Sequence, residues 1–261
     1  MRALALTDVQ RFQLVDIPLP SVRPNSVLIR VAAVGLCGTD LHIYKGDANY
    51  NLDLSFCPIP LSDSPQILGH ETSGWVERVG ADVRRCRVGD LVIVDQVLSC
   101  VGQQRTDLCE YCETGDAHQC EFAQELGITG LPGGFADFIA VPETNIVKVP
   151  EQMPALQAAI AEPLACIVHA QERSDRAATR YSWEGKHRIR HVAILGAGPS
   201  GLLFLQFLRN VRRFDGVIFV IDLREAKLDL ARRLGATAID SRHADVGTLF
   251  VVIQEVKEFI I

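Results

Sequence analysis

The stretch HVAILGAGPSGLLFLQFLRN, residues 191–210, passes from an apolar segment through three closely spaced glycines into a second apolar segment. The first segment is typical of a buried strand and the second of a helix. Gly196, Gly198 and Gly201 form the pattern G-x-G-x-x-G, which permits a tight turn and close approach of the backbone to a pyrophosphate. The N-terminus of the following helix would add free N–H groups and a partial positive charge. The stretch therefore predicts the strand–turn–helix of a dinucleotide-binding unit, with an ordinary strand-to-helix turn as the alternative.

The next residues extend this unit into a strand–helix–strand pattern. GVIFVID, residues 216–222, reads as a second buried strand, and REAKLDLARRLGA, residues 224–236, as a helix that ends at Gly235. Such an order predicts an α/β fold with a doubly wound parallel sheet. Asp222 ends the second strand about 20 residues beyond the glycines, where an acid would bond the adenosine ribose hydroxyls. It favours NAD over NADP because it would repel a 2′-phosphate, although Arg224 nearby weakens that preference.

The first 150 residues have a different character. Val- and Ile-rich runs, separated by Gly, Pro, Asp and Asn, predict strands joined by turns. The clearest runs are residues 26–35, 74–80, 90–97, 135–142 and 145–150. From residue 155 the composition is helical, with Pro163 at a boundary or kink, and residues 180–190 read as a polar linker. We therefore expect three parts: a β-rich domain at residues 1–155, a connecting helix and linker at 156–186, and the dinucleotide unit at 187–261.

Bulk properties exclude several classes of protein. The net charge of −6 is mild and forms no basic stripe, which argues against a nucleic-acid partner. No apolar run approaches the roughly 20 residues that span a membrane, and the start lacks the pattern of a signal peptide. We therefore expect a soluble cytoplasmic protein. Because thiols stay reduced in that compartment, the eight cysteines indicate metal binding more than disulfides.

Residues suited to zinc chemistry gather in three places. They are Cys37, Thr39, Asp40 and His42 in GLCGTDLHIYKG, His70 and Glu71 in ILGHETSGWVERVG, and Glu162 in AEPLACIVHA. A catalytic zinc has about three protein ligands of the Cys, His and carboxylate types and keeps one position open. These residues therefore predict a catalytic zinc site.

A separate loop, SCVGQQRTDLCEYCETGDAHQC at residues 99–120, holds four cysteines: Cys100, Cys109, Cys112 and Cys120. Four thiolates close the tetrahedron around zinc and leave no position for a substrate, so such a site is structural. Eight residues separate Cys100 from Cys109, whereas the next pair is a tight C-x-x-C.

Taken in order, these segments resemble the zinc-dependent medium-chain alcohol and polyol dehydrogenases of the sorbitol-, glucose- and threonine-dehydrogenase-like kind. The resemblance rests on GLCGTDLH, GHE, VGDLVIVDQ, the cysteine loop, GGFADFIAVP, AEPLAC and GAGPSG. It implies a GroES-like catalytic domain followed by a Rossmann domain. It also implies hydride transfer between an alcohol carbon and a nicotinamide, a small polyol- or sugar-like substrate, and a homo-oligomer.

The resemblance further implies roles for single residues. Cys37 and His70 match the most dependable zinc ligands. Glu71 and Glu162 match carboxylates that bind zinc directly or hold water beside it.

The proton path is implied in the same way. Thr39 matches the hydroxyl that takes the alcohol proton, and His42 matches the relay residue that passes it to solvent. Asp40 matches the acid that orients the zinc-bound histidine.

In the cysteine loop, Cys109, Cys112 and Cys120 match the last three ligands of the family's structural zinc. The family's first position corresponds to Thr106, a poor ligand, so we expect a longer loop to bring Cys100 back. The alternatives are completion by Asp107 or His118, or a degraded site with free thiols.

The end of the chain departs from the family pattern. The resemblance implies that later Rossmann strands and a C-terminal return segment are absent, as in a C-terminally truncated member. A second hypothesis is therefore a catalytically inactive zinc-binding remnant or interaction module.

Overall fold

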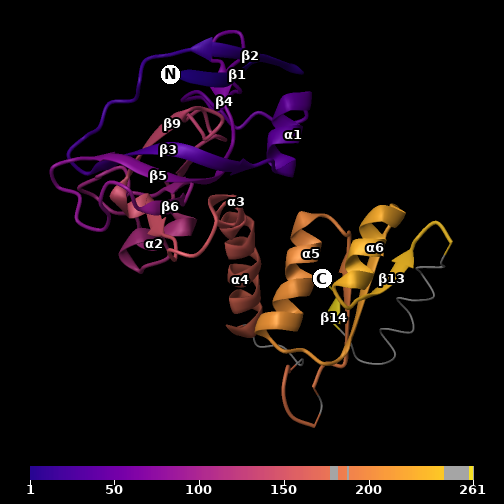
Figure 1. Ribbon diagram of the computed structural model, residues 1–261. Coiled ribbons are helices and arrows are strands. Elements are labelled where there is room, and N and C mark those ends of the chain that lie inside the picture. The colour runs from indigo at the N-terminus through magenta and orange to yellow at the C-terminus, as the bar shows by residue number, and fades with distance from the viewer. Residues whose placement is uncertain (177–181, 187, 244–258, 261) are drawn as a thin grey trace. The chain divides into compact units, whose positions relative to one another are not determined.

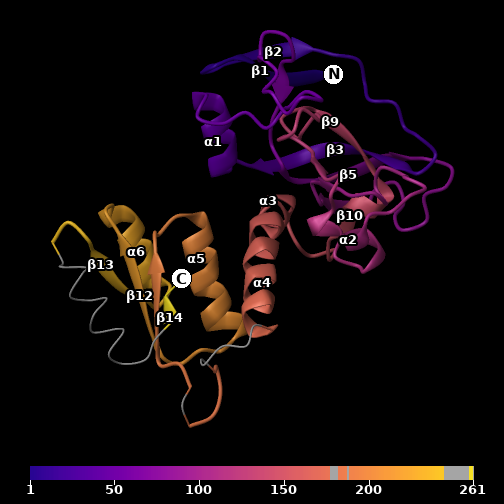
Figure 2. The same cartoon turned by 180° about the vertical axis from the view of Figure 1, so that it is seen from behind.

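The computed structural model describes residues 1–176, 182–186, 188–243 and 259–260. The chain forms two compact units, Met1–Glu162 and Pro163–Ile261, which Figures 1 and 2 show from opposite sides. No helix in the described ranges is both long enough and apolar enough to cross a bilayer. The antiparallel sheets belong to the first unit and the parallel sheet to the second.

A five-stranded antiparallel sheet forms the centre of the first unit, in the order β10-β6-β5-β3-β9. Its strands are β3 (Ser26–Gly35), β5 (Glu71–Val79), β6 (Leu91–Val94), β9 (Phe138–Pro142) and β10 (Ile146–Lys148). Each coincides with one of the Val- and Ile-rich runs. The apolar side chains of these strands pack into one buried cluster that includes Val27, Ile29, Val92 and Val141.

A smaller sheet, in the order β2-β1-β4, lies in the same unit and was not predicted. It consists of β1 (Arg2–Asp8), β2 (Arg11–Asp16) and β4 (Gln66–Ile67). The hairpin between β1 and β2 turns through Gln10, which has a positive φ of 59°. Helix α1 (Gly38–Lys45) contributes Ile43 to a buried cluster with Leu6 of this sheet and with Leu68. This packing fixes the helix that begins directly after Cys37.

Short elements, some of them within or beside the cysteine loop, complete the first unit. They are β7 (Val97–Leu98), α2 (Glu110–Glu113), η1 (Ala117–Gln119), β8 (Gln124–Glu125), η2 (Glu143–Asn145) and α3 (Ala155–Ala158). Strands β7 and β8 pair antiparallel and bring the two ends of the loop together. The loop therefore projects from the sheet as a closed lobe.

The second unit contains the predicted strand–helix–strand pattern. Its parallel sheet has the order β13-β12-β11-β14, with β11 (His191–Leu195), β12 (Val217–Asp222), β13 (Thr237–Asp240) and β14 (Phe259–Ile260). The helices are α4 (Ala161–Arg176), α5 (Pro199–Gln206), which continues into the π-helix η3 (Phe207–Val211), and α6 (Glu225–Arg233). Figures 1 and 2 show α5 and α6 side by side along this sheet. Their apolar faces and the strands form a separate core.

Candidate metal and dinucleotide sites

The four thiols of the cysteine loop lie together in the lobe. The sulfur atoms of Cys100, Cys109, Cys112 and Cys120 all lie within 4.8 Å of one another. The Sγ atom of Cys120 is 3.5 Å from that of Cys100 and 3.8 Å from that of Cys109. Cys100, Cys109 and Cys120 are buried, and they form an apolar cluster with Cys112. We call this set the four-thiol cluster.

The eight-residue segment before Cys109 returns the chain through consecutive backbone turns. The N–H of Gln103 donates to the carbonyl of Ser99 at 2.9 Å, and the N–H of Arg105 donates to that of Cys100 at 3.0 Å. The side-chain amide of Gln103 also donates to the carbonyls of Leu98 and Phe122 at 2.9 and 2.6 Å. These bonds hold Cys100 beside the other three thiols.

The alternative ligands for this cluster have other contacts. Nε2 of His118 lies 3.1 Å from the Asp95 carboxylate, and Asp107 accepts a hydrogen bond from Arg105 at 2.9 Å. Thr106 is exposed. The geometry thus brings Cys100, and neither His118 nor Asp107, into the set of ligand atoms within 4.8 Å.

The thiols of the four-thiol cluster do not titrate alike. Burial raises the pKa of Cys112 to about 12. Burial would also raise the pKa of Cys109, but hydrogen bonds from the backbone N–H groups of Cys112 and Glu121 outweigh it and lower the pKa to about 7. One thiolate thus forms readily, and a metal ion would deprotonate the remaining thiols. The donor set fits a closed zinc site.

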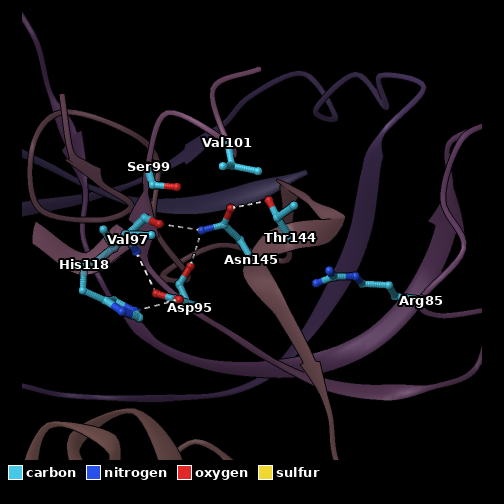
Figure 3. Close-up of a pocket in the computed structure, with 9 residues that line it drawn as sticks. Arg85, Asp95, Val97, Ser99, Val101, His118, Thr144 and Asn145 are labelled. Carbon is cyan, nitrogen blue, oxygen red and sulfur yellow. Dashed lines mark hydrogen bonds and ion pairs between the residues drawn. The ribbon is translucent and has the colours of Figure 1, made fainter. Parts of the chain in front are cut away.

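Polar contacts attach the lobe to the large sheet around a pocket of about 240 Å³ (Figure 3). Asp95, which follows β6, accepts from the N–H of Val97 at 3.0 Å and contacts His118 of the lobe. The buried amide of Asn145 donates to the carbonyls of Asp95 and Val97 at 2.9 and 2.8 Å. Thr144 in turn donates to Asn145 at 3.1 Å. These contacts therefore hold the lobe, and with it the four-thiol cluster, in place against the sheet.

A second group of ligand atoms belongs to Cys37, His70 and Glu71, again within 4.8 Å of one another. We call it the Cys37 cluster. Cys37 is the N-cap residue of α1, and Glu71 begins β5 directly after His70. Because Gly35, at the end of β3, is the register partner of Glu71, sheet pairing brings the two segments together.

The predicted acid, Asp40, fixes the backbone around the Cys37 cluster. Its buried carboxylate accepts from the N–H groups of Cys37 at 2.8 Å and Gly69 at 3.1 Å. Its Oδ1 also lies 3.7 Å from Nδ1 of His70, a buried atom with no hydrogen bond. Because Nδ1 faces the carboxylate, Nε2 is the nitrogen left for a metal ion.

Electrostatics in the Cys37 cluster favour a cation. The hydrogen bond with His70 lowers the pKa of the Cys37 thiol. Burial alone would lower the pKa of His70, but Cys37 and the charge of Asp40 raise it overall. Burial raises the pKa of Glu71. A thiolate, an imidazole and a desolvated carboxylate within one group fit a zinc ion, whose charge would replace the bound protons.

The other predicted residues lie around this cluster at different distances. Thr39 accepts a hydrogen bond from Cys37 Sγ at 3.8 Å. His42 is exposed, and its Nδ1 is 3.4 Å from Asp47. The carboxylate of Glu162 accepts from the Gln96 amide at 2.9 Å; its charge helps to raise the pKa of His70, but it lies outside the group within 4.8 Å.

Two residues around the Cys37 cluster were missed by sequence reasoning. Gln96 binds Glu162, and Gly35 leaves the space that Glu71 fills, because a Cβ atom on Gly35 would lie 1.8 Å from Oε2 of Glu71. The available signals were weak: Gln96 belongs to VGDLVIVDQ, and Gly35 ends a strand of large apolar residues.

In the second unit, the glycine turn has the form that a pyrophosphate needs. Gly196 has a φ of 102°, and a Cβ atom on Gly201 would lie 2.0 Å from the Gly196 carbonyl oxygen. A Cβ atom on Gly196 or Gly198 would meet nothing within 4 Å, so the backbone there is open to a ligand. Gly198 caps α5, with Pro199 as its first residue. The cradle therefore fits a dinucleotide.

Asp222 connects this turn to the end of β12. One carboxylate oxygen accepts from the N–H of Ala197 at 2.8 Å and the other from the N–H of Arg224 at 2.9 Å. Nζ of Lys227 is 3.9 Å away. Burial would raise the pKa of Asp222, but these donors lower it, so the carboxylate is ionised at neutral pH.

Two family matches cover most of the chain. Residues 23–151 match the alcohol dehydrogenase GroES-like domain, and residues 155–261 match the glucose dehydrogenase C-terminus. The chain belongs to the zinc-dependent medium-chain alcohol and polyol dehydrogenase family. The predicted fold, a GroES-like domain followed by a partial Rossmann domain, is confirmed.

Two curated relatives show the degree of sequence identity between this chain and single proteins. An L-threonine 3-dehydrogenase of Anaeromyxobacter dehalogenans is 33% identical over 222 residues, which are 85% of this chain and 56% of the relative. A sorbitol dehydrogenase of Bacillus subtilis is 29% identical over 239 residues, 92% of this chain and 60% of the relative. The chain thus spans little more than half the length of these curated relatives.

Solved structures agree in fold, and some hold a dinucleotide. Galactitol-1-phosphate dehydrogenase from Escherichia coli superposes with a TM-score of 0.80 at 25% identity, over 100% of this chain and 67% of that one. An alcohol dehydrogenase from E. coli CFT073 in complex with NADH has a TM-score of 0.78 at 26% identity, over 97% and 66%. A zinc-binding dehydrogenase from Sinorhizobium meliloti bound to NADP has 0.74 at 30%, over 94% and 63%. The family thus uses NADH or NADP, and the likeness leaves both open for this chain.

Proposed function

We propose that this chain carries the zinc and dinucleotide sites of a dehydrogenase that transfers a hydride between a secondary alcohol and NAD(P). The observation that carries the proposal is the Cys37 cluster, in which a thiol, an imidazole and a carboxylate converge. The relatives with threonine, sorbitol and galactitol phosphate in their names support a small hydroxylated substrate of polyol or sugar type.

Cys37, His70 and Glu71 would hold the catalytic zinc, with Glu162 as an alternative carboxylate beside it. Bound zinc would supply a Lewis acid that acidifies the hydroxyl of an alcohol. Asp40 keeps Nδ1 of His70 turned away from the ligand position and so orients the ring.

Thr39 and His42 would serve as the proton path. Thr39 contacts Cys37, so its hydroxyl lies beside one of the proposed ligands of the catalytic zinc. His42 is exposed on the same helix, beside Asp47, and can exchange its proton with water. The resemblance to the family gives these residues the first and last places on the path: Thr39 would accept the proton at Oγ1, and His42 would release it to solvent.

In the four-thiol cluster, zinc bound by Cys100, Cys109, Cys112 and Cys120 would be structural. Four thiolate ligands leave no open coordination position. Its function would be to hold the lobe closed.

For the cofactor, Gly196, Gly198 and Gly201 would receive the pyrophosphate and Asp222 the adenosine ribose. An ionised carboxylate at Asp222 repels a 2′-phosphate, so we propose NAD as the preferred cofactor. We also propose that the protein is cytoplasmic and forms a homo-oligomer. Light scattering of the purified protein would test the oligomeric state.

NADH formation from a panel of polyols and 3-hydroxy amino acids such as threonine, with and without a chelator, tests the activity. We expect chelator-sensitive turnover of at least one secondary alcohol. A folded, zinc-loaded chain that binds NAD but turns over none of them would favour the inactive zinc-binding remnant.

A further inference from the structure

A second acidic strand end lies directly beside Asp222. Strand β13 pairs parallel with β12, and Asp240 is the register partner of Asp222. The N–H of Ser241 donates to the carbonyl of Asp222 at 3.3 Å. The carboxyl ends of parallel strands meet at one edge of a sheet, where ligands of such folds bind. Asp240 therefore belongs to the edge at which we placed the adenosine ribose.

Both strand ends carry the same Asp-x-Arg pattern in the same kind of turn. The N–H of Arg224 donates to Asp222 Oδ1, and the N–H of Arg242 donates to Asp240 Oδ1, each at 2.9 Å. Two arginine side chains thus follow two carboxylates at the edge of this sheet.

The two guanidinium groups are used differently. Nε of Arg242 lies 3.0 and 3.1 Å from the two carboxylate oxygens of Asp240, and its NH2 group contacts the same carboxylate. This pairing holds the pKa of Asp240 far below its ordinary value. Within the described part of the chain, Arg224 is exposed and its guanidinium makes no ion pair. One arginine is therefore neutralised by its own neighbour while the other is not.

Such a difference matters for cofactor choice. A 2′-phosphate on the adenosine ribose is recognised mainly by arginine, whose planar fork donates two hydrogen bonds to phosphate oxygens. An arginine whose donors are already occupied by a carboxylate cannot do this without losing that pair.

We propose that Asp240 is a specificity-determining residue for the cofactor. By holding the guanidinium of Arg242, it keeps this arginine from a 2′-phosphate next to Asp222 and so strengthens the preference for NAD. The inference rests on the dinucleotide function proposed above, and it concerns the adenosine half of the cofactor alone.

Two probes contain that half and lack the nicotinamide: ADP-ribose and 2′-phospho-ADP-ribose, titrated by calorimetry into the purified full chain. Asp240→Asn removes the charge but keeps an oxygen for the N–H of Arg242. We expect it to leave the Kd for ADP-ribose unchanged and to tighten 2′-phospho-ADP-ribose about tenfold, the effect of one charge-assisted contact. The double variant Asp240→Asn with Arg242→Gln should return that Kd to the value of the unchanged chain.

Asp215→Asn is the matched control. Asp215 forms an ion pair with Arg188 at 3.0 Å, just before β12 begins, at the opposite end of the sheet. This variant should change neither Kd. Asp240→Ser is a second variant that removes the charge of this carboxylate. Thermal unfolding, recorded for every variant, separates a selectivity effect from a folding defect.

The possible outcomes distinguish the two proposals. If the unchanged chain binds ADP-ribose but Asp240→Asn does not alter the ratio of the two Kd values, the inference is wrong and the dinucleotide function stands. If the double variant keeps the tighter binding, the gain came from lost repulsion, and the role of Arg242 is wrong. If a folded chain binds neither probe, both proposals are overturned.

Discussion

At the scale of single residues, Gly35 shows how an absent side chain positions a ligand. The carboxylate of Glu71 occupies the space where a Cβ atom of Gly35 would be, with Cβ, Cδ and Oε2 of Glu71 all within 3 Å of that position. The residues of the Cys37 cluster could be predicted from their types and order. The choice between Glu71 and Glu162 could not, because it depends on the strand register that sets Gly35 opposite Glu71.

Gly35→Ala should therefore displace Glu71 and weaken metal binding at the Cys37 cluster. We expect a loss of about 10- to 100-fold in affinity, as for other changes that disturb the support of a ligand. Zinc retained after dialysis against graded chelator measures it, with the four-thiol cluster as internal reference. Gly38→Ala is the control, since its Cβ would meet nothing within 4 Å; equal retention in both variants would show that Glu71 does not bind the metal.

Asp90 gives a pH prediction remote from both metal clusters. Burial would raise its pKa, but Lys148 and the N–H of Arg87, each at 2.9 Å, lower it below the ordinary 3.8. A lowered folded-state pKa means that this carboxylate stabilises the fold above about pH 4 and stops doing so as the pH falls through the folded value.

Asp90→Asn should accordingly cost about 1 kcal/mol of unfolding free energy at pH 7, the worth of a hydrogen-bonded charge at a partly exposed site. The difference from the unchanged chain should shrink toward zero in acid. Urea unfolding between pH 7 and pH 3 measures this, with exposed Asp82→Asn as the control. A difference that is independent of pH would contradict the assignment.

At the scale of elements, the sequence of the cysteine loop predicts its metal-binding character but not the position of each ligand. Its metal-binding character follows from four cysteines in one polar segment. Whether Cys100 joins the others depends on how eight residues fold, and the bonds of Gln103 to the carbonyls of Leu98 and Phe122 decide that. The β1–β2 hairpin was missed because β2 is a mixed polar strand, RFQLVD, with no buried face.

Arg209, in the π-helix η3, connects three parts of the second unit by hydrogen bonds. The partly buried guanidinium of Arg209 donates to the carbonyls of Phe214 and Gly216 at 2.7 Å each and to that of Gly235 at 2.9 Å. It thereby joins the end of η3, the start of β12 and the end of α6.

Arg209→Leu should destabilise the second unit by about 2 kcal/mol, because three carbonyls lose a charged donor. Trp183 packs edge-on against Phe214 at 5.7 Å and can report unfolding by fluorescence in a Trp75→Phe background. Exposed Arg233→Leu is the control. A midpoint equal to that of the control would mean that water replaces the guanidinium at no cost.

At the scale of the whole molecule, the change from Val-rich runs to a strand–helix–strand pattern predicted a β-rich part followed by a parallel sheet. The boundary between the two parts differs with the criterion. The family matches meet between residues 151 and 155, whereas the compact units meet between Glu162 and Pro163. Helix α4 begins at Ala161, so one helix belongs to both parts. The predicted connecting segment at residues 156–186 stays a prediction.

The two metal clusters both lie in Met1–Glu162, and we propose that each holds one zinc ion. Zinc content per purified chain, measured by mass spectrometry with inductively coupled plasma, tests it most directly. We expect two zinc ions, one for each cluster. Cys100→Ser should remove the structural zinc alone, while Cys57→Ser, at an exposed free thiol, should remove none. A folded chain without zinc, or one that keeps both ions after Cys100→Ser, would show that these clusters are not zinc sites of the proposed kind.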